Sequence, residues 1–184
     1  MKIELTTPLN REKLAQLNAG DIVSISGTIF AARDAAHKKM IALIEEGKEL
    51  PFEIKNQVIY YVGPCPEKPG QVIGSAGPTT SGRMDAYTPK LIQMGLLGMI
   101  GKGERSPSVK KAIVEFGAVY FGCTGGAGAL LSKAVVSQEI IAFGELGPEA
   151  LRKLVVKDFP AIVVLDAHGN NLYEIGRNKF EKVR

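Results

Sequence analysis

The sequence predicts an α/β fold, in which helices cover a largely buried and at least partly parallel sheet. Short runs rich in β-branched residues alternate along the chain with segments whose apolar residues have helical spacing. Several of these runs are apolar nearly throughout, as in "AIVVL", which is typical of strands buried on both faces. The 184 residues are 45% hydrophobic and 23% charged, and no composition shift marks a linker, so we expect a single domain over residues 1–184.

The first third of the chain predicts a short helix, a strand and a longer helix. "NREKLAQLNAG" has Asn10 as a candidate N-cap and Gly20 as a stop signal, which indicates a helix. Residues 21–32, "DIVSISGTIFAA", alternate β-branched residues and predict a strand. Residues 33–47 have a helical stripe that ends at a glycine, so Arg33 and Asp34 are expected where a strand passes into a helix.

The middle of the chain contains the motif of greatest interest, "SAGPTTSGRMDAYTPK". We predict strands in "QVIYYVGP", in "QVIGSAGP" just before the two threonines, and in "LLGMIGKG". A helix is expected to begin near Gly82, and a second helical piece has Pro89 in its first turn. A further helix begins after Ser106, which is a good N-cap, with a proline directly behind it.

The last third is predicted to alternate in the same way. "AVYFGC" is a strand, and "TGGAGALLSKA" is a glycine-rich loop that opens a short helix. "AVVSQEIIAFG" is a strand, and "AIVVLDAHGNNLYEIG" is expected to be a hairpin that turns at Gly169 and Asn170. The final eight residues are expected to be an exposed helix.

Composition argues against several classes of protein. The net charge is +4 with a pI near 9.0, but Lys and Arg are spread along the chain and aromatic residues are only 7%, so no nucleic-acid partner is expected. No apolar run reaches the roughly 20 residues that a bilayer requires, and the N-terminus lacks the apolar core of a signal peptide, so no membrane partner is expected. Cys65 and Cys123 are expected to be free thiols in a reducing cytoplasm.

Metal binding by this chain alone is not expected. His37 and His168 have no companion at ligand spacing, and two cysteines are too few for an iron–sulfur cluster, which usually needs about four thiolates. We interpret Cys123 as a small, buried side chain that packs like a hydrophobic residue.

Polar residues follow four predicted strands and indicate an anion site. These segments are Ala32–Asp34, Gly77–Arg83, Gly101–Gly103 and Gly122–Gly126. Ligands of open α/β sheets bind outside the carboxyl ends of the strands. Arg33 and Arg83 could each clamp a carboxylate and Lys102 could support one, which describes a dicarboxylate site that a phosphate would fit almost as well.

Each of these residues also has a structural interpretation. Arg83 could form a local ion pair with Asp85, and Thr79 and Thr80 could simply cap the following helix. The glycine-rich loop matches neither a phosphate-binding P-loop nor a dinucleotide fingerprint, so by itself it is weak support for a ligand site.

Three stretches of the chain resemble a known family. "SGTIFAARDAAHKKM", "GSAGPTTSGRMDAYTPKLIQMGLLGMIGKG" and "GGAGALLSKAV" are similar to the β-type subunit, or C-terminal catalytic domain, of class I iron–sulfur fumarate hydratases and L-tartrate dehydratases. The likeness runs from about Gly27 through Val135. It implies a three-layer β/β/α swivelling domain, and a catalytic pocket shared with an α-type subunit in a hetero-oligomer. It also implies a 4Fe-4S cluster that the α-type subunit holds, with none bound by this chain alone.

The resemblance also implies roles for individual residues. Arg33, Arg83 and Lys102 match the family's carboxylate ligands, Thr79 matches the proposed catalytic base, and Thr80 is its neighbour in the pocket. Asp85 is expected to orient Arg83. Cations on the carboxylate stabilise the charge that develops when the adjacent carbon loses its proton, while an open iron acts as a Lewis acid on the leaving hydroxyl.

The sequence leaves four functions open. Reversible hydration of fumarate to malate is preferred, and dehydration of L-tartrate is the nearest rival. A non-catalytic module that binds a dicarboxylate or a phosphate is the third, and a scaffold for a catalytic partner is the fourth.

Overall fold

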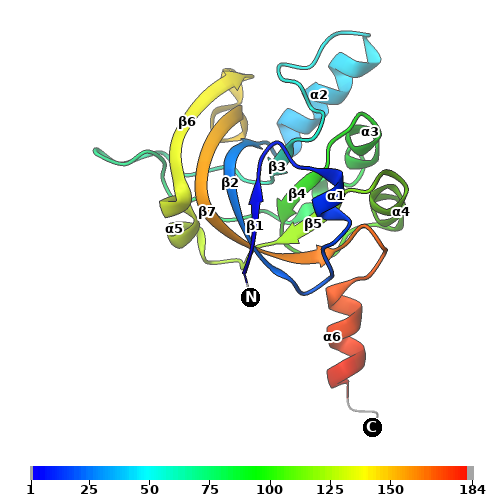
Figure 1. Ribbon diagram of the computed structural model, residues 1–184. Helices are drawn as coiled ribbons and strands as arrows, with labels where there is room; N and C mark the ends of the chain where they lie inside the picture. The colour runs from blue at the N-terminus through cyan, green and yellow to red at the C-terminus, as the bar shows by residue number, and fades with distance from the viewer. Residues whose placement is uncertain (1, 182–184) are drawn as a thin grey trace.

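A seven-stranded sheet organises the computed structural model, which describes residues 2–181 (Figure 1). The strands are β1 Lys2–Thr6, β2 Ile22–Ala31, β3 Val58–Tyr60, β4 Gly98–Gly101, β5 Val119–Gly122, β6 Val135–Ala142 and β7 Leu151–Leu165. Their order in the sheet is β1-β2-β3-β4-β5-β7-β6. Neighbouring strands from β1 to β5 are parallel, and β7 is antiparallel to each of its partners. The predicted α/β class with a partly parallel sheet is confirmed.

The long strand β7 closes part of this sheet on itself. It pairs with β5 near its C-terminal end, and along its other edge it pairs with β2 from Ile22↔Ile162 to Ala31↔Arg152. Strands β2, β3, β4, β5 and β7 therefore form a closed circuit of hydrogen-bonded neighbours. β1 and β6 add to the outside of this circuit.

The helices begin and end at the local signals that the sequence carries. They are α1 Arg11–Leu14, α2 Asp34–Glu45, α3 Thr88–Gln93, α4 Pro107–Phe116, α5 Gly128–Leu131 and α6 Leu172–Phe180, with short 3-10 turns η1 Ser81–Met84, η2 Ser132–Ala134 and η3 Gly144–Glu149. The Asn10 side chain accepts hydrogen bonds from the first turn of α1, and the Ser106 side chain accepts one from Val109 N at the start of α4. Gly117 ends α4 in the left-handed region, at φ +67°, where a glycine has no steric cost.

Two apolar cores lie on opposite faces of the central strands. One lies within the closed circuit and includes Tyr60 of β3 and Phe159 of β7, whose rings meet edge to face at 5.2 Å. The other lies between the sheet and α2, α3 and α4, which gather on one side in Figure 1, and it includes Tyr61. Because successive side chains of a strand point to opposite faces, Tyr60 and Tyr61 enter different cores.

The strand predicted in "QVIGSAGP" is not formed. Residues 71–78 run as an irregular segment held by single backbone hydrogen bonds, from Cys65 N to Ser75 O at 2.9 Å and from Ala76 N to Gly128 O at 3.1 Å. A Cβ at Gly74 would overlap the carbonyl groups of Cys65 and Pro66, so the chain here packs against another loop and not against a strand. The apolar run "VIG" is too short to decide this by its pattern.

The predicted hairpin at Gly169 and Asn170 is also wrong. β7 is a single strand of 15 residues, and the residues after the turn form helix α6. Asp166 organises the turn because its carboxylate accepts hydrogen bonds from His168 N and Asn170 N, both at 2.9 Å. Asn171 then caps α6 by accepting from Tyr173 N. The exposed helix predicted at the end of the chain is confirmed as far as Phe180, and residues 182–184 lie outside the described residues.

Helix α6 extends away from the rest of the protein in Figure 1, and none of its residues is buried. Its first turn touches the domain through Glu174, whose carboxylate lies 2.8 Å from Lys110 Nζ on α4. Within residues 2–181, no helix is long and apolar enough to span a membrane.

Candidate active site

The predicted polar segments meet at one edge of the sheet. β2, β3, β4 and β5 are parallel, so their carboxyl ends lie side by side. The segment with the two threonines joins this edge: Thr79 N donates to Tyr61 O at 2.8 Å, and Ser81 N donates to Lys102 O at 2.9 Å. Thr80 pairs with Lys102 as an isolated parallel bridge. Thr79 and Thr80 therefore lie between the ends of β3 and β4.

Arg33 and Arg83 are brought together by Asp34. The Asp34 carboxylate accepts from Arg83 Nε at 2.7 Å through one oxygen, and from Arg33 Nε at 3.2 Å through the other. Burial raises the pKa of Asp34, but hydrogen bonds from its own backbone amide and from the two arginines outweigh this, so its pKa lies below the ordinary value. The carboxylate is thus ionised at neutral pH. It fixes both guanidinium groups through Nε alone.

The geometry of Arg33 is set from three further directions. Glu149 of η3 places Oε1 3.5 Å from Arg33 Nε, and its Oε2 accepts from Ala35 N in the first turn of α2. His37 donates from its backbone and from Nδ1 to the Arg33 carbonyl, each at 2.9 Å. A Cβ on Gly63 would lie 2.9 Å from Arg33 Cδ, so a glycine is required where the arginine stem crosses the end of β3.

The expected pair between Arg83 and Asp85 is not formed. Arg83 pairs with Asp34, and the Asp85 carboxylate accepts from Arg105 Nε at 2.7 Å and from Ser106 N. Both residues lie at the 3-10 turn η1, and residues two apart on a helical turn point to different sides. Asp85 therefore supports a different arginine from the one that the sequence suggested.

Lys102 lies at the glycine-rich loop that follows β5. A Cβ at Gly125 would lie 3.4 Å from Lys102 Nζ, so the ammonium group passes close over this loop. Lys102 lines a pocket of about 310 Å³, together with Cys123, Thr124, Tyr173 and the apolar side chains of β7. Burial raises the pKa of the Cys123 thiol to about 12, so the thiol is protonated at neutral pH. This agrees with its interpretation as a small, unreactive side chain.

The predicted residues thus fall into two groups along one edge. Arg33, Asp34 and Arg83 form the first, and Lys102 with the glycine-rich loop forms the second, with Thr79 and Thr80 between them. Within residues 2–181, no side-chain hydrogen bond joins the two groups.

Sequence reasoning missed Arg105, which is only 4% exposed. It lies behind the threonine segment and contacts Asp85, Tyr61, Thr88 and Tyr120. The only feature of the sequence that could have pointed to Arg105 is its position three residues after Lys102. The periodic spacing of apolar residues predicts which apolar side chains are buried, and it does not predict a buried arginine.

Metal ligands do not gather in this part of the protein. Among residues 2–181, no three His, Cys, Asp or Glu side chains are placed to hold one metal ion. Cys65 is exposed and Cys123 is half-buried, and neither is in a disulfide. The donors present do not fit an iron–sulfur cluster.

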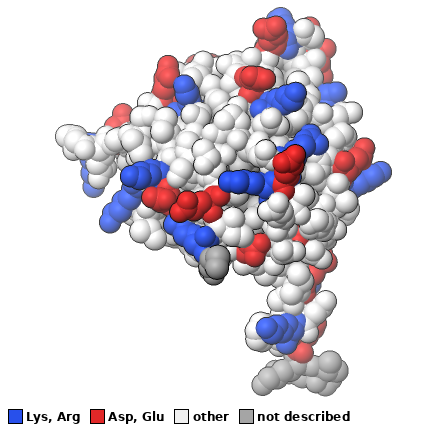
Figure 2. All heavy atoms as spheres, viewed as in Figure 1, with Lys and Arg blue, Asp and Glu red and all other residues white. Residues whose placement is uncertain are grey.

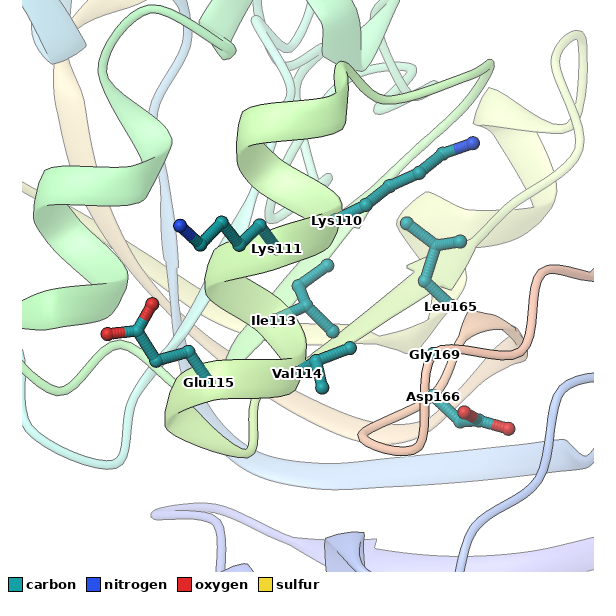
Figure 3. Close-up of a pocket in the computed structure, with 8 residues that line it drawn as sticks. All are labelled: Lys110, Lys111, Ile113, Val114, Glu115, Leu165, Asp166 and Gly169. Carbon is teal, nitrogen blue, oxygen red and sulfur yellow. The ribbon is translucent and has the colours of Figure 1, made fainter.

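A larger pocket of about 550 Å³ lies between α4 and the turn after β7, where the apolar side chains of Ile113, Val114 and Leu165 are flanked by Lys110, Lys111, Glu115 and Asp166 (Figure 3). Figure 2 shows both signs of charge interspersed on the viewed face, with no block of Lys and Arg.

Comparisons with known proteins agree with these observations. Residues 1–176 match the family model described as Fumarase C-terminus. The chain is 42% identical over 184 residues to an anaerobic class I fumarate hydratase of Escherichia coli, covering 97% of this chain and 33% of that protein. It is 41% identical to fumarate hydratase 2 of Leishmania major, covering 94% and 31%.

A third relative is close to this chain in length. This is a protein of Methanocaldococcus jannaschii named as a putative L(+)-tartrate dehydratase subunit beta, which is 37% identical over 182 residues, covering 95% of this chain and 93% of the relative. The chain therefore spans about a third of the fumarate hydratases above and nearly all of the tartrate dehydratase subunit.

Proposed function

The chain belongs to the Fumarase C-terminus family, and from this premise we propose that it is the β-type subunit of a hydro-lyase that reversibly hydrates fumarate to malate. The observation that carries the proposal is the Arg33–Asp34–Arg83 cluster at the carboxyl edge of the parallel strands. Relatives named as fumarate hydratases, at about 40% identity over most of the chain, support it.

The arginine pair is proposed to bind one carboxylate of the substrate. Asp34 engages Nε of each guanidinium, and the Arg83 side chain is 50% exposed, so the terminal nitrogens of Arg83 would be open to a ligand. A guanidinium presents a planar fork that matches a carboxylate with two parallel hydrogen bonds. Two cations face two carboxylates, Asp34 and Glu149, so the cluster carries no net charge, and its attraction for an anion would come from the guanidinium N–H groups that these carboxylates leave unused.

Thr79 and Lys102 are proposed to act on the rest of the substrate. Thr80 pairs with Lys102 in the β-bridge and Thr79 N donates to Tyr61 O, so the two threonines lie at the ends of β3 and β4. Lys102 would hold the second carboxylate, and the Thr79 oxygen, as its alkoxide, would take the proton from the carbon beside the first and become a hydroxyl. A hydroxyl is a weak base at neutral pH, so this step depends on nearby cations that stabilise the alkoxide.

We propose that an α-type subunit completes the enzyme as a hetero-oligomer and holds the 4Fe-4S cluster, since the described residues of this chain do not fit one. The relative of matching length is named as a subunit beta, which supports this division. When bound there, the cluster would supply a Lewis acid for the hydroxyl that leaves or enters.

The two cores on opposite faces of the strands support the proposed three-layer β/β/α swivelling domain. Two unpaired cysteines fit a cytoplasmic location.

Dehydration of L-tartrate is the second candidate, because a relative named for that reaction matches this chain along 93% of its own length. Tartrate carries one more hydroxyl than malate. The same cations and the same threonine would serve both reactions.

The test is fumarate hydration measured without oxygen, for the chain alone and for the chain mixed with an α-type iron–sulfur subunit from the same source. We expect turnover only in the mixture. A complex that carries its cluster and is inactive on fumarate would be given L-tartrate next, and activity there would replace fumarate by tartrate. Dicarboxylate binding without any turnover would indicate a binding module, and unchanged activity after substitution of Arg33, Thr79, Arg83 and Lys102 would indicate a scaffold.

A further inference from the structure

The Arg105 guanidinium is buried behind the threonine segment, and the protein contacts it on all sides. Its side chain is fully buried and pairs with Asp85, whose own side chain is 11% exposed, at 2.7 Å. The guanidinium carbon lies 5.2 Å from the ring centre of Tyr61 and 4.9 Å from that of Tyr120, within the range of cation–π contacts. Arg105 thus links the end of β3 to β5 across β4.

The hydroxyl groups around Arg105 have one consistent set of donors. Thr88 donates its only hydroxyl proton to Met84 O at 2.9 Å, so it accepts from Arg105 Nη2 at 3.0 Å and from the Tyr61 hydroxyl at 3.2 Å. Tyr61 in turn accepts from Arg105 Nη2 at 3.4 Å. Each hydroxyl donates once, which makes the cluster a directed network and not a set of interchangeable contacts.

Tyr120 connects the same guanidinium to the residues beside Lys102. Its hydroxyl donates to Gly103 O at 3.0 Å, so the Ser81 hydroxyl must donate to it at 2.9 Å. Ser81 is fully buried and lies against Gly101, where a Cβ would overlap its hydroxyl. Gly101 thus packs against the Ser81 hydroxyl that donates to Tyr120, and the Gly103 carbonyl accepts from Tyr120. Both residues that flank Lys102 therefore contact this hydrogen-bond network.

Both tyrosines hold the segment that contains the threonines. The Tyr61 carbonyl accepts the Thr79 amide at 2.8 Å, and the Tyr120 hydroxyl accepts from Ser81. Arg105 touches the rings of both tyrosines, so it braces Thr79, Thr80 and Ser81 from the two ends of the segment. It contacts none of the proposed ligand residues itself.

Stability alone does not explain an arginine at this place. Arg105 Nη1 is buried and has no hydrogen-bond partner among residues 2–181. A buried donor without a partner costs about 1–3 kcal/mol, and buried ion pairs are often no more stabilising than apolar residues of the same shape. An arginine fixes directions that an apolar side chain cannot, because its planar fork donates in set orientations.

We propose that Arg105 is a positioning residue, which sets the place of Thr79 and Thr80 relative to Lys102 through Tyr61 and Tyr120. The proposal rests on the proposed function for its effect on turnover. Its effect on the threonine segment does not depend on any activity, so the two can be tested separately.

The experiment compares Arg105→Lys with the unchanged chain and with Arg11→Lys, an exposed arginine on α1 that serves as the matched control. Lysine keeps the charge opposite Asp85 but has no planar fork. Backbone amide hydrogen exchange is measured for Thr79 and Ser81, with Ile25 of β2 as the internal reference. In Arg105→Lys we expect exchange at Thr79 and Ser81 to rise about tenfold while Ile25 is unchanged, and the control to match the unchanged chain.

Turnover is then measured in the complex with the α-type subunit. We expect kcat to fall about 100-fold with KM within about threefold, because a misplaced base affects the transition state more than it affects substrate binding. A complex of the unchanged chain that is inactive on fumarate and tartrate would overturn the proposed function, and the exchange data would still decide the positioning role.

Two results would overturn the inference. One is unchanged exchange at Thr79 and Ser81 in folded Arg105→Lys, and the other is an equal rise at Ile25, which indicates a general loss of stability. Should Arg105→Lys fail to fold, Tyr120→Phe replaces it, because this variant keeps the ring beside Arg105 and removes only the hydroxyl. It is expected to raise exchange at Ser81 about tenfold, and no rise there would count against the proposal.

Discussion

At the scale of single residues, the two arginines of the candidate site are paired with protein carboxylates before any ligand arrives. The Asp34 carboxylate forms salt bridges with Nε of Arg33 and of Arg83, and the Glu149 carboxylate forms a second salt bridge with Arg33. These pairs hold the guanidinium planes in place, which reduces the freedom that substrate binding must remove. Arg83 is the more exposed of the two, so it is the better candidate for direct contact with a substrate carboxylate.

Substitution at Thr79 and at Arg83 should separate two kinds of contribution. We expect Thr79→Ala to abolish turnover in the complex while dicarboxylate binding stays within about threefold, since a base acts mainly in the transition state. Arg83→Ala is expected to weaken binding and turnover together, because an arginine clamp holds both the substrate and the transition state. Steady-state kinetics and calorimetric titration with a dicarboxylate measure the two effects.

Each variant has its own contrary result. An active Thr79→Ala enzyme would remove Thr79 from the role of base. An Arg83→Ala chain with unchanged affinity would show that Arg83 does not bind the carboxylate.

At the scale of elements, the start of α2 holds the charged residues that follow β2. Asp34 is in the first turn of the helix, where a negative charge is favourable, and Glu149 caps the amide of Ala35 from η3. One turn later, His37 returns a hydrogen bond to the Arg33 carbonyl, so the helix holds the arginine through its backbone as well as its side chain. His37 is fully buried, and its ring lies edge-on to Tyr61 at 5.3 Å.

The stability of the protein should fall in mild acid because of His37. Burial, with a smaller contribution from Arg105, lowers its pKa to about 4, although the bond to Arg33 O and the charge of Asp34 oppose this. Between about pH 6.5 and 4 the unfolded chain binds a proton that the folded chain does not, so stability decreases as the pH falls through this window, by roughly 3 kcal/mol in total.

His37→Asn tests this expectation, since asparagine can still donate to the Arg33 carbonyl but does not titrate. Urea unfolding between pH 4.5 and 7.5 should show a shallower pH dependence in this variant than in the unchanged chain. His168→Asn is the matched control, because His168 is exposed, and it should retain the full slope. Equal slopes in all three proteins would show that His37 is not the titrating group.

At the scale of the whole molecule, two cores share the same strands. Ile25 of β2 belongs to the core inside the closed circuit, and Leu91 of α3 belongs to the core under the helices. The candidate site lies at the edge where these layers end, so its residues come from strands, from η1 and from the start of α2. Loss of either core should therefore disturb the site.

The two cores are expected to unfold together. Ile25→Ala and Leu91→Ala should each lower the free energy of unfolding by about 2–5 kcal/mol and keep a single transition. Far-ultraviolet circular dichroism and tyrosine fluorescence report the transition, because Tyr60 and Tyr61 lie in different cores. Ile175→Ala on α6 is the control, with an expected change within about 0.5 kcal/mol, since Ile175 is 46% exposed. Two separate midpoints in either core variant would mean that the layers fold independently.

The α/β class, most of the strands and the helix ends with strong caps could be predicted from the sequence alone. Asn10 and Ser106 bond to amides two or three residues away, and Gly47 and Gly117 relieve strain at their own positions, so these signals are local. The sequence also placed Arg33 and Lys102 after strands that the structure forms. Thr79, Thr80 and Arg83 instead follow an irregular segment, which joins the same edge through the bonds from Thr79 N to Tyr61 O and from Ser81 N to Lys102 O.

The pairing of charges and the fold of the last third of the chain depend on tertiary contacts that could not be predicted. Asp34 meets Arg83 across 49 residues, and Asp85 meets Arg105 across 20, whereas the sequence favoured the nearer pair of Arg83 and Asp85. β7 is a single strand rather than half of a hairpin because both of its edges are occupied, by β2 on one side and by β5 and β6 on the other. Pairings of this kind depend on which segments the folded chain brings together, and no signal within a few residues carries that information.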